Sequence, residues 1–171
     1  MANTFKKIET ATLGSGGGTI TFSSIPQTYT DLYLVISSRK STTSTTDLGI
    51  RFNSEGTYNN FTSLTGTGST LANSSFTNMS YNYVENVVPG TNFTSLIFGS
   101  TEMYIPNYTN SSTHSTLATG VNENDGTNAY QVISAGINTS VQSAITSISI
   151  VSGTGTLVQY TSATLYGIKS S

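Results

Sequence analysis

The chain has no cysteine and no tryptophan, and only 8% of its 171 residues are charged. Without cysteine there is neither a disulfide framework nor a thiolate metal site. Six lysine and arginine residues are too few for the basic footprint of a nucleic-acid-binding protein. The first ten residues lack the apolar stretch of a secretory signal, and no apolar run approaches the roughly 18 residues that span a bilayer. We therefore expect no nucleic acid and no membrane among its partners.

The scarcity of charge also bears on the kind of protein this is. Ordinary soluble proteins have about 25% charged residues, which keep free monomers dispersed. A surface of serine, threonine and asparagine suits a protein that is held in a large rigid assembly, or one exposed to harsh media outside cells. Both interpretations point away from metabolism.

What the chain has instead is serine and threonine, roughly a third of all residues, together with ten tyrosines and seven phenylalanines. Disorder would call for low hydrophobicity and high net charge, whereas this chain is 35% apolar with a net charge of -2. Threonine, tyrosine, valine, isoleucine and phenylalanine all favour a pleated, half-buried surface. The composition predicts an all-β protein, and the length suits one domain with a real core.

The segment Leu32–Ile36 is the densest apolar run and the expected centre of the fold. Leu32, Leu34 and Ile36 share one face of a strand, and Tyr33 and Val35 share the other. Apolar residues on both faces predict a central strand that is covered on both sides.

Further strands are expected along the whole chain, separated by glycine, proline and asparagine turns. Together they predict a single-domain antiparallel β-sandwich or barrel. Residues 54–93 are less regular and suggest short strands with long exposed loops. The expected strands cover residues 5–13, 19–22, 50–53, 76–88, 94–105, 113–121, 129–137, 144–151 and 156–168, with a bulge or break near Gly99.

Few residues suggest chemistry, and each has a simpler explanation. The glycine-rich segment 14–18 precedes a strand rather than a helix, so a hairpin turn is favoured over a phosphate-binding loop. His114 lies among serines, but no nucleophile elbow is present, and we expect a surface or edge-strand residue. The segment Asn122–Gly126 offers oxygen ligands for calcium but reads better as a turn, because the EF-hand spacing is missing. We predict no enzyme, no catalytic residue, no metal site and no cofactor.

Tyrosines offer the remaining candidate site. Tyr81 and Tyr83 are candidate contacts for a glycan or a partner, and the region Tyr104–Tyr108 is a second place for a sugar-stacking surface. The lack of tryptophan weakens the case for a lectin.

Three segments resemble small structural proteins of tailed bacteriophages: Ile20–Leu32 (ITFSSIPQTYTDL), Tyr104–Thr109 (YIPNYT) and Ser162–Lys169 (SATLYGIK). The resemblance spans nearly the whole chain and is weakest over residues 54–93. It implies a jelly-roll-like sandwich and a capsid cement or decoration protein on the outer surface of the phage head. It also implies a homotrimer whose partner is the major capsid protein.

Within that role we expect an N-terminal arm, residues 1–7, followed by the sandwich domain, residues 8–171. The arm would reach a neighbouring subunit, with Phe5, Lys6 and Lys7 as capsid-contact candidates. The alternative is a tail or fibre module that recognises host-surface glycans through Tyr81 and Tyr83.

Overall fold

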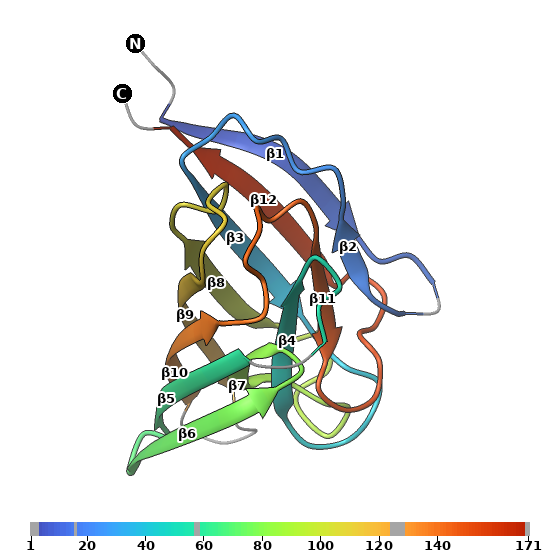
Figure 1. Ribbon diagram of the computed structural model, residues 1–171. Coiled ribbons are helices and arrows are strands. Elements are labelled where there is room, and N and C mark those ends of the chain that lie inside the picture. Colours follow the sequence, from blue (N-terminus) through green and yellow to red (C-terminus); the bar gives the residue numbers. More distant parts are fainter. Residues whose placement is uncertain (1–3, 16, 57–58, 124–128, 170–171) are drawn as a thin grey trace.

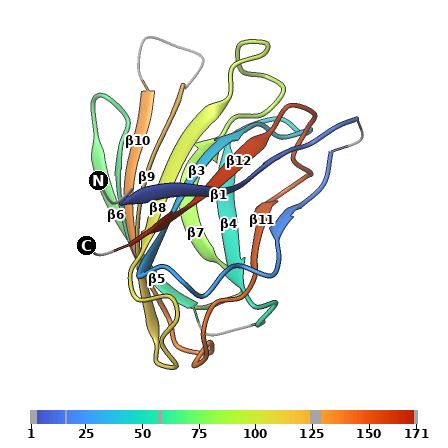
Figure 2. The same ribbon diagram turned by 90° about the horizontal axis from the view of Figure 1, so that it is seen from above.

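The computed structural model describes residues 4–15, 17–56, 59–123 and 129–169. All regular structure in this part of the chain is β-strand, in two antiparallel sheets that pack as a sandwich (Figures 1 and 2). No helix here is long and apolar enough to cross a membrane. The strands are β1 (Phe5–Thr12), β2 (Ile20–Phe22), β3 (Asp31–Ser38), β4 (Thr46–Phe52), β5 (Asn59–Gly66), β6 (Leu71–Met79), β7 (Asn82–Val88), β8 (Gly99–Ile105), β9 (His114–Glu123), β10 (Ala129–Asn138), β11 (Ile148–Ser152) and β12 (Ser162–Ile168).

The strand order is that of a jelly roll with two insertions. The large sheet has the order β1-β12-β3-β8-β9-β10-β5-β6, and the small sheet has the order β2-β11-β4-β7. We leave out β5, β6, β9 and β10 and number the remaining eight strands 1 to 8 along the chain. The large sheet then has the order 1-8-3-6, and the small sheet has the order 2-7-4-5. This double Greek-key order defines the jelly roll. The predicted all-β, jelly-roll-like sandwich is therefore confirmed.

The two inserted pairs come from different loops of the jelly roll and meet in space. Strands β5 and β6 follow β4, whereas β9 and β10 follow β8. Antiparallel pairing of β10 with β5 joins them and extends the large sheet to eight strands. The expectation of short strands and long loops over residues 54–93 is wrong, because β5, β6 and β7 fill most of that segment.

An apolar core lies between the four jelly-roll strands of each sheet. The inward side chains of β3 (Leu32, Leu34 and Ile36) face those of β4 and β11, and all of these are almost fully buried. Strand β3 lies between β12 and β8, so its predicted central position is confirmed. The prediction that both of its faces are covered is wrong, because Val35 on the outer face is 39% exposed.

Polar side chains fill much of the interior beneath the inserted strands. The Ser134 hydroxyl on β10 donates to the carbonyl oxygen of Tyr83 at 3.0 Å, and the Asn122 amide on β9 donates to that of Asn86 at 3.3 Å. Both carbonyls belong to β7, the last strand of the small sheet. Buried polar groups need such partners, so these side chains cap the edge of the small sheet from within.

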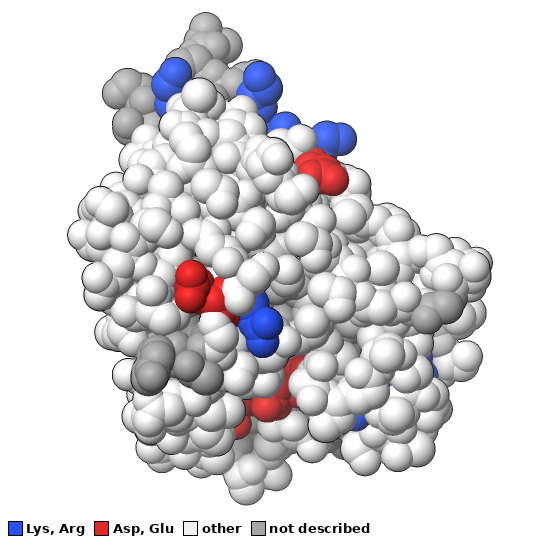
Figure 3. All heavy atoms as spheres, turned by 45° about the vertical axis from the view of Figure 1, so that its right-hand side comes forward, with Lys and Arg blue, Asp and Glu red and all other residues white. Residues whose placement is uncertain are grey.

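Two buried basic residues also donate hydrogen bonds to backbone carbonyl oxygens. The Arg39 guanidinium donates to the carbonyl oxygens of Phe93, Thr94 and Ile97 at 2.7–3.2 Å. Lys40 donates to the carbonyl of Thr45 at 3.3 Å, and burial lowers its pKa. Arg51 lies over a tyrosine ring. Three of the six basic side chains, Arg39, Lys40 and Arg51, therefore make contacts within the protein. The face of the molecule seen in Figure 3 is correspondingly poor in charge.

Candidate functional site

The outer face of the large sheet is not covered by any other described element. On β8, β9 and β10 every second side chain is buried and the ones between point outward. The outward positions carry aliphatic side chains that are 39% to 71% exposed. We call this surface the aliphatic face; its residues are Val35, Leu64, Leu71, Leu117, Val121, Ile133 and Ile137.

The strand register places these residues in rows across the sheet. Val35, Glu102, Thr119, Ile133 and Leu64 stand directly beside one another on five consecutive strands. A hollow of about 380 Å³ lies along this row, and Glu102 and Thr119 line it. Ile133 is the direct neighbour of Leu64, and Leu117 and Val121 lie diagonally across from Ile133 on β9. A cluster of exposed aliphatic side chains marks an interaction surface, whereas single exposed ones are ordinary.

Charge is nearly absent from this surface. Glu102 and Glu123 are the charged residues of β8, β9, β10, β5 and β6 taken together. Glu123, at the end of β9, accepts hydrogen bonds from the amide of Thr94 at 2.7 Å and from its hydroxyl at 3.0 Å. A sheet face with so few charges loses less hydration when a partner covers it than a highly charged face would.

Glu102 is held by two neighbours on the same face. It accepts a hydrogen bond from the Tyr33 hydroxyl and another from the Thr119 hydroxyl at 2.9 Å. These bonds, that of Tyr33 first, lower the pKa of Glu102, and the same contact raises the pKa of Tyr33 to about 12. The carboxylate is thus kept ionised, which does not suit a general acid or base near neutral pH.

Next to the aliphatic face, aromatic rings form a ladder. Tyr166, Tyr33 and Tyr104 stand side by side on β12, β3 and β8. Phe5 on β1 packs its ring 5.6 Å from that of Tyr33 and 6.0 Å from that of Tyr166, measured between centroids. The Tyr104 hydroxyl donates to Asp31 at 2.9 Å. The ladder is half-exposed, and it continues the open face toward β1.

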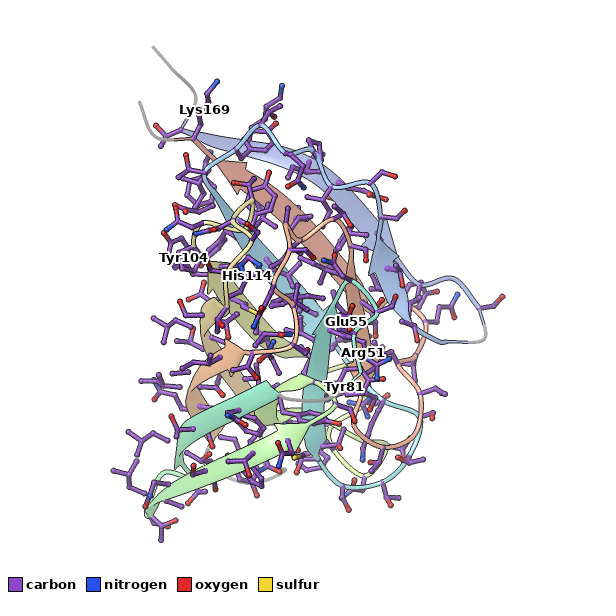
Figure 4. The ribbon with its side chains drawn as sticks, viewed as in Figure 1. Arg51, Glu55, Tyr81, Tyr104, His114 and Lys169 are labelled. Carbon is purple, nitrogen blue, oxygen red and sulfur yellow. The ribbon has the colours of Figure 1, made fainter. Side chains whose placement is uncertain are left out.

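The structure corrects the expected N-terminal arm. Phe5, Lys6 and Lys7 belong to β1 and pair with Ile168, Gly167 and Tyr166 of β12. They are exposed, as a contact role requires, but they form a sheet edge and not a free arm; residues 1–3 lie outside the described part of the chain. Basic side chains gather at this corner, where Lys169 also lies (Figures 3 and 4).

Tyr81 and Tyr83 are brought together, with ring centroids 5.6 Å apart. The Arg51 guanidinium lies over the Tyr81 ring, 4.1 Å from its centroid, and Glu55 lies close by (Figure 4). Tyr83 contacts Phe61, and burial raises the pKa of Tyr83. The pair therefore bridges the small sheet to the inserted β5–β6 hairpin, and its rings pack mainly on the protein itself.

The other candidates have structural roles among the described residues. His114 is 2% exposed on an inner strand, with Nε2 2.9 Å from the carbonyl oxygen of Ser143, so its expected surface or edge position is wrong. The segment Asn122–Gly126 begins at the end of β9, and its residues 124–126 lie outside the description. No group of three or more His, Asp or Glu side chains among the described residues is placed to hold a metal ion.

The three segments that carry the phage resemblance lie against one another. Segment 162–169 forms β12 beside β3, and β8 on the other side of β3 leads into the turn at Asn107 and Tyr108. Asp31 accepts hydrogen bonds from Tyr104 and from the Asn107 amide, each at 2.9 Å, and the Tyr108 hydroxyl donates to the Pro26 carbonyl. The segments thus form one corner of the jelly roll.

Comparison of the chain with family models, curated proteins and solved structures gave no match. The candidate site therefore rests on the geometry alone. It is the aliphatic face with the adjoining tyrosine ladder. Sequence reasoning did not single out the aliphatic face, and of the ladder's tyrosines it singled out only Tyr104.

Proposed function

We propose that this protein is a structural component of a tailed-phage head, a cement or decoration protein that binds the outside of the major capsid protein lattice. The observation that carries the proposal is the aliphatic face, a broad, nearly uncharged surface on a rigid eight-stranded sheet. The identification of the partner rests on the resemblance of the three segments described above.

The physics of such a role needs contact area and stiffness rather than reactive groups. Each aliphatic side chain that a capsid subunit covers contributes roughly 25 cal/mol per Å² of apolar surface removed from water. A protein that binds the assembled lattice but not separated subunits stabilises the lattice by mass action. The jelly roll supplies the stiffness, because the outward side chains other than Leu71 stand on strands that are paired on both sides.

The tyrosine ladder adds to the same surface. Tyrosine rings are enriched at interfaces because they combine a large apolar area with a polar hydroxyl. Here the hydroxyls of Tyr33 and Tyr104 are already bonded to Glu102 and Asp31, so the rings are fixed before a partner arrives. Preformed side chains lose less conformational entropy on binding.

The proposal is tested by rebinding. Capsids that lack the protein are mixed with the purified chain, and bound copies are counted by quantitative mass spectrometry against the major capsid protein. We expect a count on the order of hundreds per capsid, as positions repeated over an icosahedral shell require. Leu117→Lys with Ile133→Lys should reduce binding at least tenfold, since each lysine would be desolvated in the contact.

Leu96→Lys is the matched control, because Leu96 is exposed and aliphatic but lies in the loop before β8. Equal binding by the double variant and the wild type would refute the assignment of the face. Only a few to a few dozen copies per virion would move the protein to the tail or to one vertex.

A second candidate is a tail or fibre module that binds host-surface glycans, and the tyrosine ladder favours it. Sugars stack on exposed aromatic rings, and Tyr104 is 36% exposed beside two carboxylates. Binding to a glycan array that is lost in Tyr104→Ala and retained in Tyr81→Ala would support this candidate over the first.

A further inference from the structure

The four edge strands of the two sheets differ in how well they are protected. An unprotected edge presents free backbone N–H and C=O groups and pairs with other chains, so proteins blunt their edges with charges, prolines, bulges, short strands or covering elements. The edges here are β1 and β6 in the large sheet and β2 and β7 in the small one.

Three of these edges carry the known protections. Strand β1 has Lys6, Lys7 and Glu9 and a bulge between Lys7 and Glu9. Strand β2 is only three residues long. Strand β7 contains Glu85 and an irregularity opposite Thr46 and Leu48, and side chains of β9 and β10 cap its carbonyls.

Strand β6 has almost none of these protections. It is nine residues long, contains no charged residue and no proline, and pairs only with β5 among the described strands. The chain carries no charge anywhere from Gly56 to Val84. One irregularity lies near its end, where Asn78 has φ of 59°, and this leaves the stretch 71–76 regular. Figure 1 shows the β5–β6 hairpin projecting from the body with β6 outermost.

We propose that β6 is a self-association site, at which β6 of a second copy of this chain adds antiparallel to it about a two-fold axis. The strand that pairs with β6 is identified by excluding the other edges. Pairing of β6 with β1, β2 or β7 of another copy is blocked by charge, shortness or cover, so the open edge left on a second copy is β6 itself. Such a contact is isologous and closes at two chains, whereas pairing of unlike edges would build a ring or an open filament.

Electrostatics and the aliphatic face agree with this occupant. No like charges oppose each other when two uncharged hairpins meet, despite the net charge of -2 on each chain. Leu71, 71% exposed at the start of β6, would be covered by the facing strand. The two aliphatic faces would then continue across the axis into one surface. The inference does not depend on the proposed capsid role.

The experiment uses the purified full chain without capsids. Its mass is measured by analytical ultracentrifugation over a range of concentrations, together with amide hydrogen exchange of β6. We expect a dimer whose β6 amides are protected at high concentration and exchange on dilution. Asn73→Lys with Ser75→Lys should weaken the dimer about tenfold or more, because lysines of the two copies would face one another across the axis.

Thr62→Lys with Leu64→Lys is the matched control. These residues pair with Ser75 and Asn73 but lie one strand further in, on the same face. Circular dichroism checks that both variants fold. The inference is overturned by a monomer at all concentrations, by the trimer that the phage resemblance implies, by a dimer that the β6 lysines leave unchanged, or by equal loss in the control. A monomer at all concentrations would indicate that another protein pairs with β6. Equal loss in the control would indicate that the copies associate through the aliphatic face.

Discussion

Replacing Asn53 by alanine should destabilise the protein by about 3 kcal/mol, because this one side chain joins two distant segments. Its Oδ1 accepts hydrogen bonds from the amides of Thr146 and Ser147 at 2.8 and 3.1 Å, and its Nδ2 donates to the carbonyl of Ala144 at 2.9 Å. Asn53 itself has φ of 50°, a left-handed conformation that asparagine tolerates better than alanine.

The magnitude follows from these two contributions. Three bonds to backbone groups of a partly exposed segment contribute about 0.5–1 kcal/mol each, or about 2 kcal/mol together. The left-handed conformation adds about 1 kcal/mol for alanine but not for glycine. We therefore expect losses of about 3 kcal/mol for Asn53→Ala, about 2 kcal/mol for Asn53→Gly and about 1 kcal/mol for Asn53→Asp, which keeps the acceptor oxygen.

Urea unfolding followed by tyrosine fluorescence measures these differences as shifts of the midpoint at constant slope. In thermal unfolding the alanine variant should melt about 6–12 °C lower, at 2–4 °C per kcal/mol for a chain of this size. Asn78→Ala is the control, since Asn78 is also left-handed, with φ of 59°, but is exposed. It should lose only about 1 kcal/mol. Equal losses for Asn53→Ala and Asn78→Ala would refute the reasoning.

Two further predictions concern Glu102 and Gly99. Tyr33→Phe should raise the pKa of Glu102 toward its ordinary value of 4.5, and Thr119→Val should raise it less, as followed by NMR titration of the carboxyl group. Because folding lowers the pKa of Glu102, its ionised form stabilises the folded state at pH values above 4.5, and this stabilisation is lost as the pH falls through the pKa of the folded state. An unchanged pKa of Glu102 in Tyr33→Phe would contradict the assigned hydrogen bond. Gly99→Ala should cost about 2–3 kcal/mol or more in urea unfolding, because the added methyl group would overlap the backbone carbonyl oxygen of Val87, whereas Gly56→Ala meets no atom within 4 Å and should cost little. Similar stabilities of the two glycine variants would show that β8 can shift away from Val87.

The sequence predicted the fold class because composition and alternation act locally. The alternation of Leu32, Leu34 and Ile36 is enough to predict a buried strand face. The order of the strands depends instead on pairing between distant segments, such as β12 between β1 and β3. No local pattern encodes that choice.

The candidate face was missed because the inserted strands reverse the usual pattern. On β10 the inward positions include Ser134 and Gly136, whereas Ile133 and Ile137 point outward. An ordinary interpretation places isoleucine inside and serine outside. The same polar interior explains why His114 is buried, and why residues 54–93 lacked the contrast that reveals strands. Small polar residues alternating with aliphatic ones were the available signal.

The position of β12 has a consequence for how this chain acquires its structure. The last strand is placed between the first and the third, and the two ends of the described chain meet at one corner (Figure 1). Until Ser162–Ile168 has been synthesised, β1 has no neighbour in the sheet and one side of β3 stays unpaired. Contacts of such long sequence separation form slowly, and partly made sheets aggregate. The large sheet can therefore be completed only after residues 162–168 have left the ribosome.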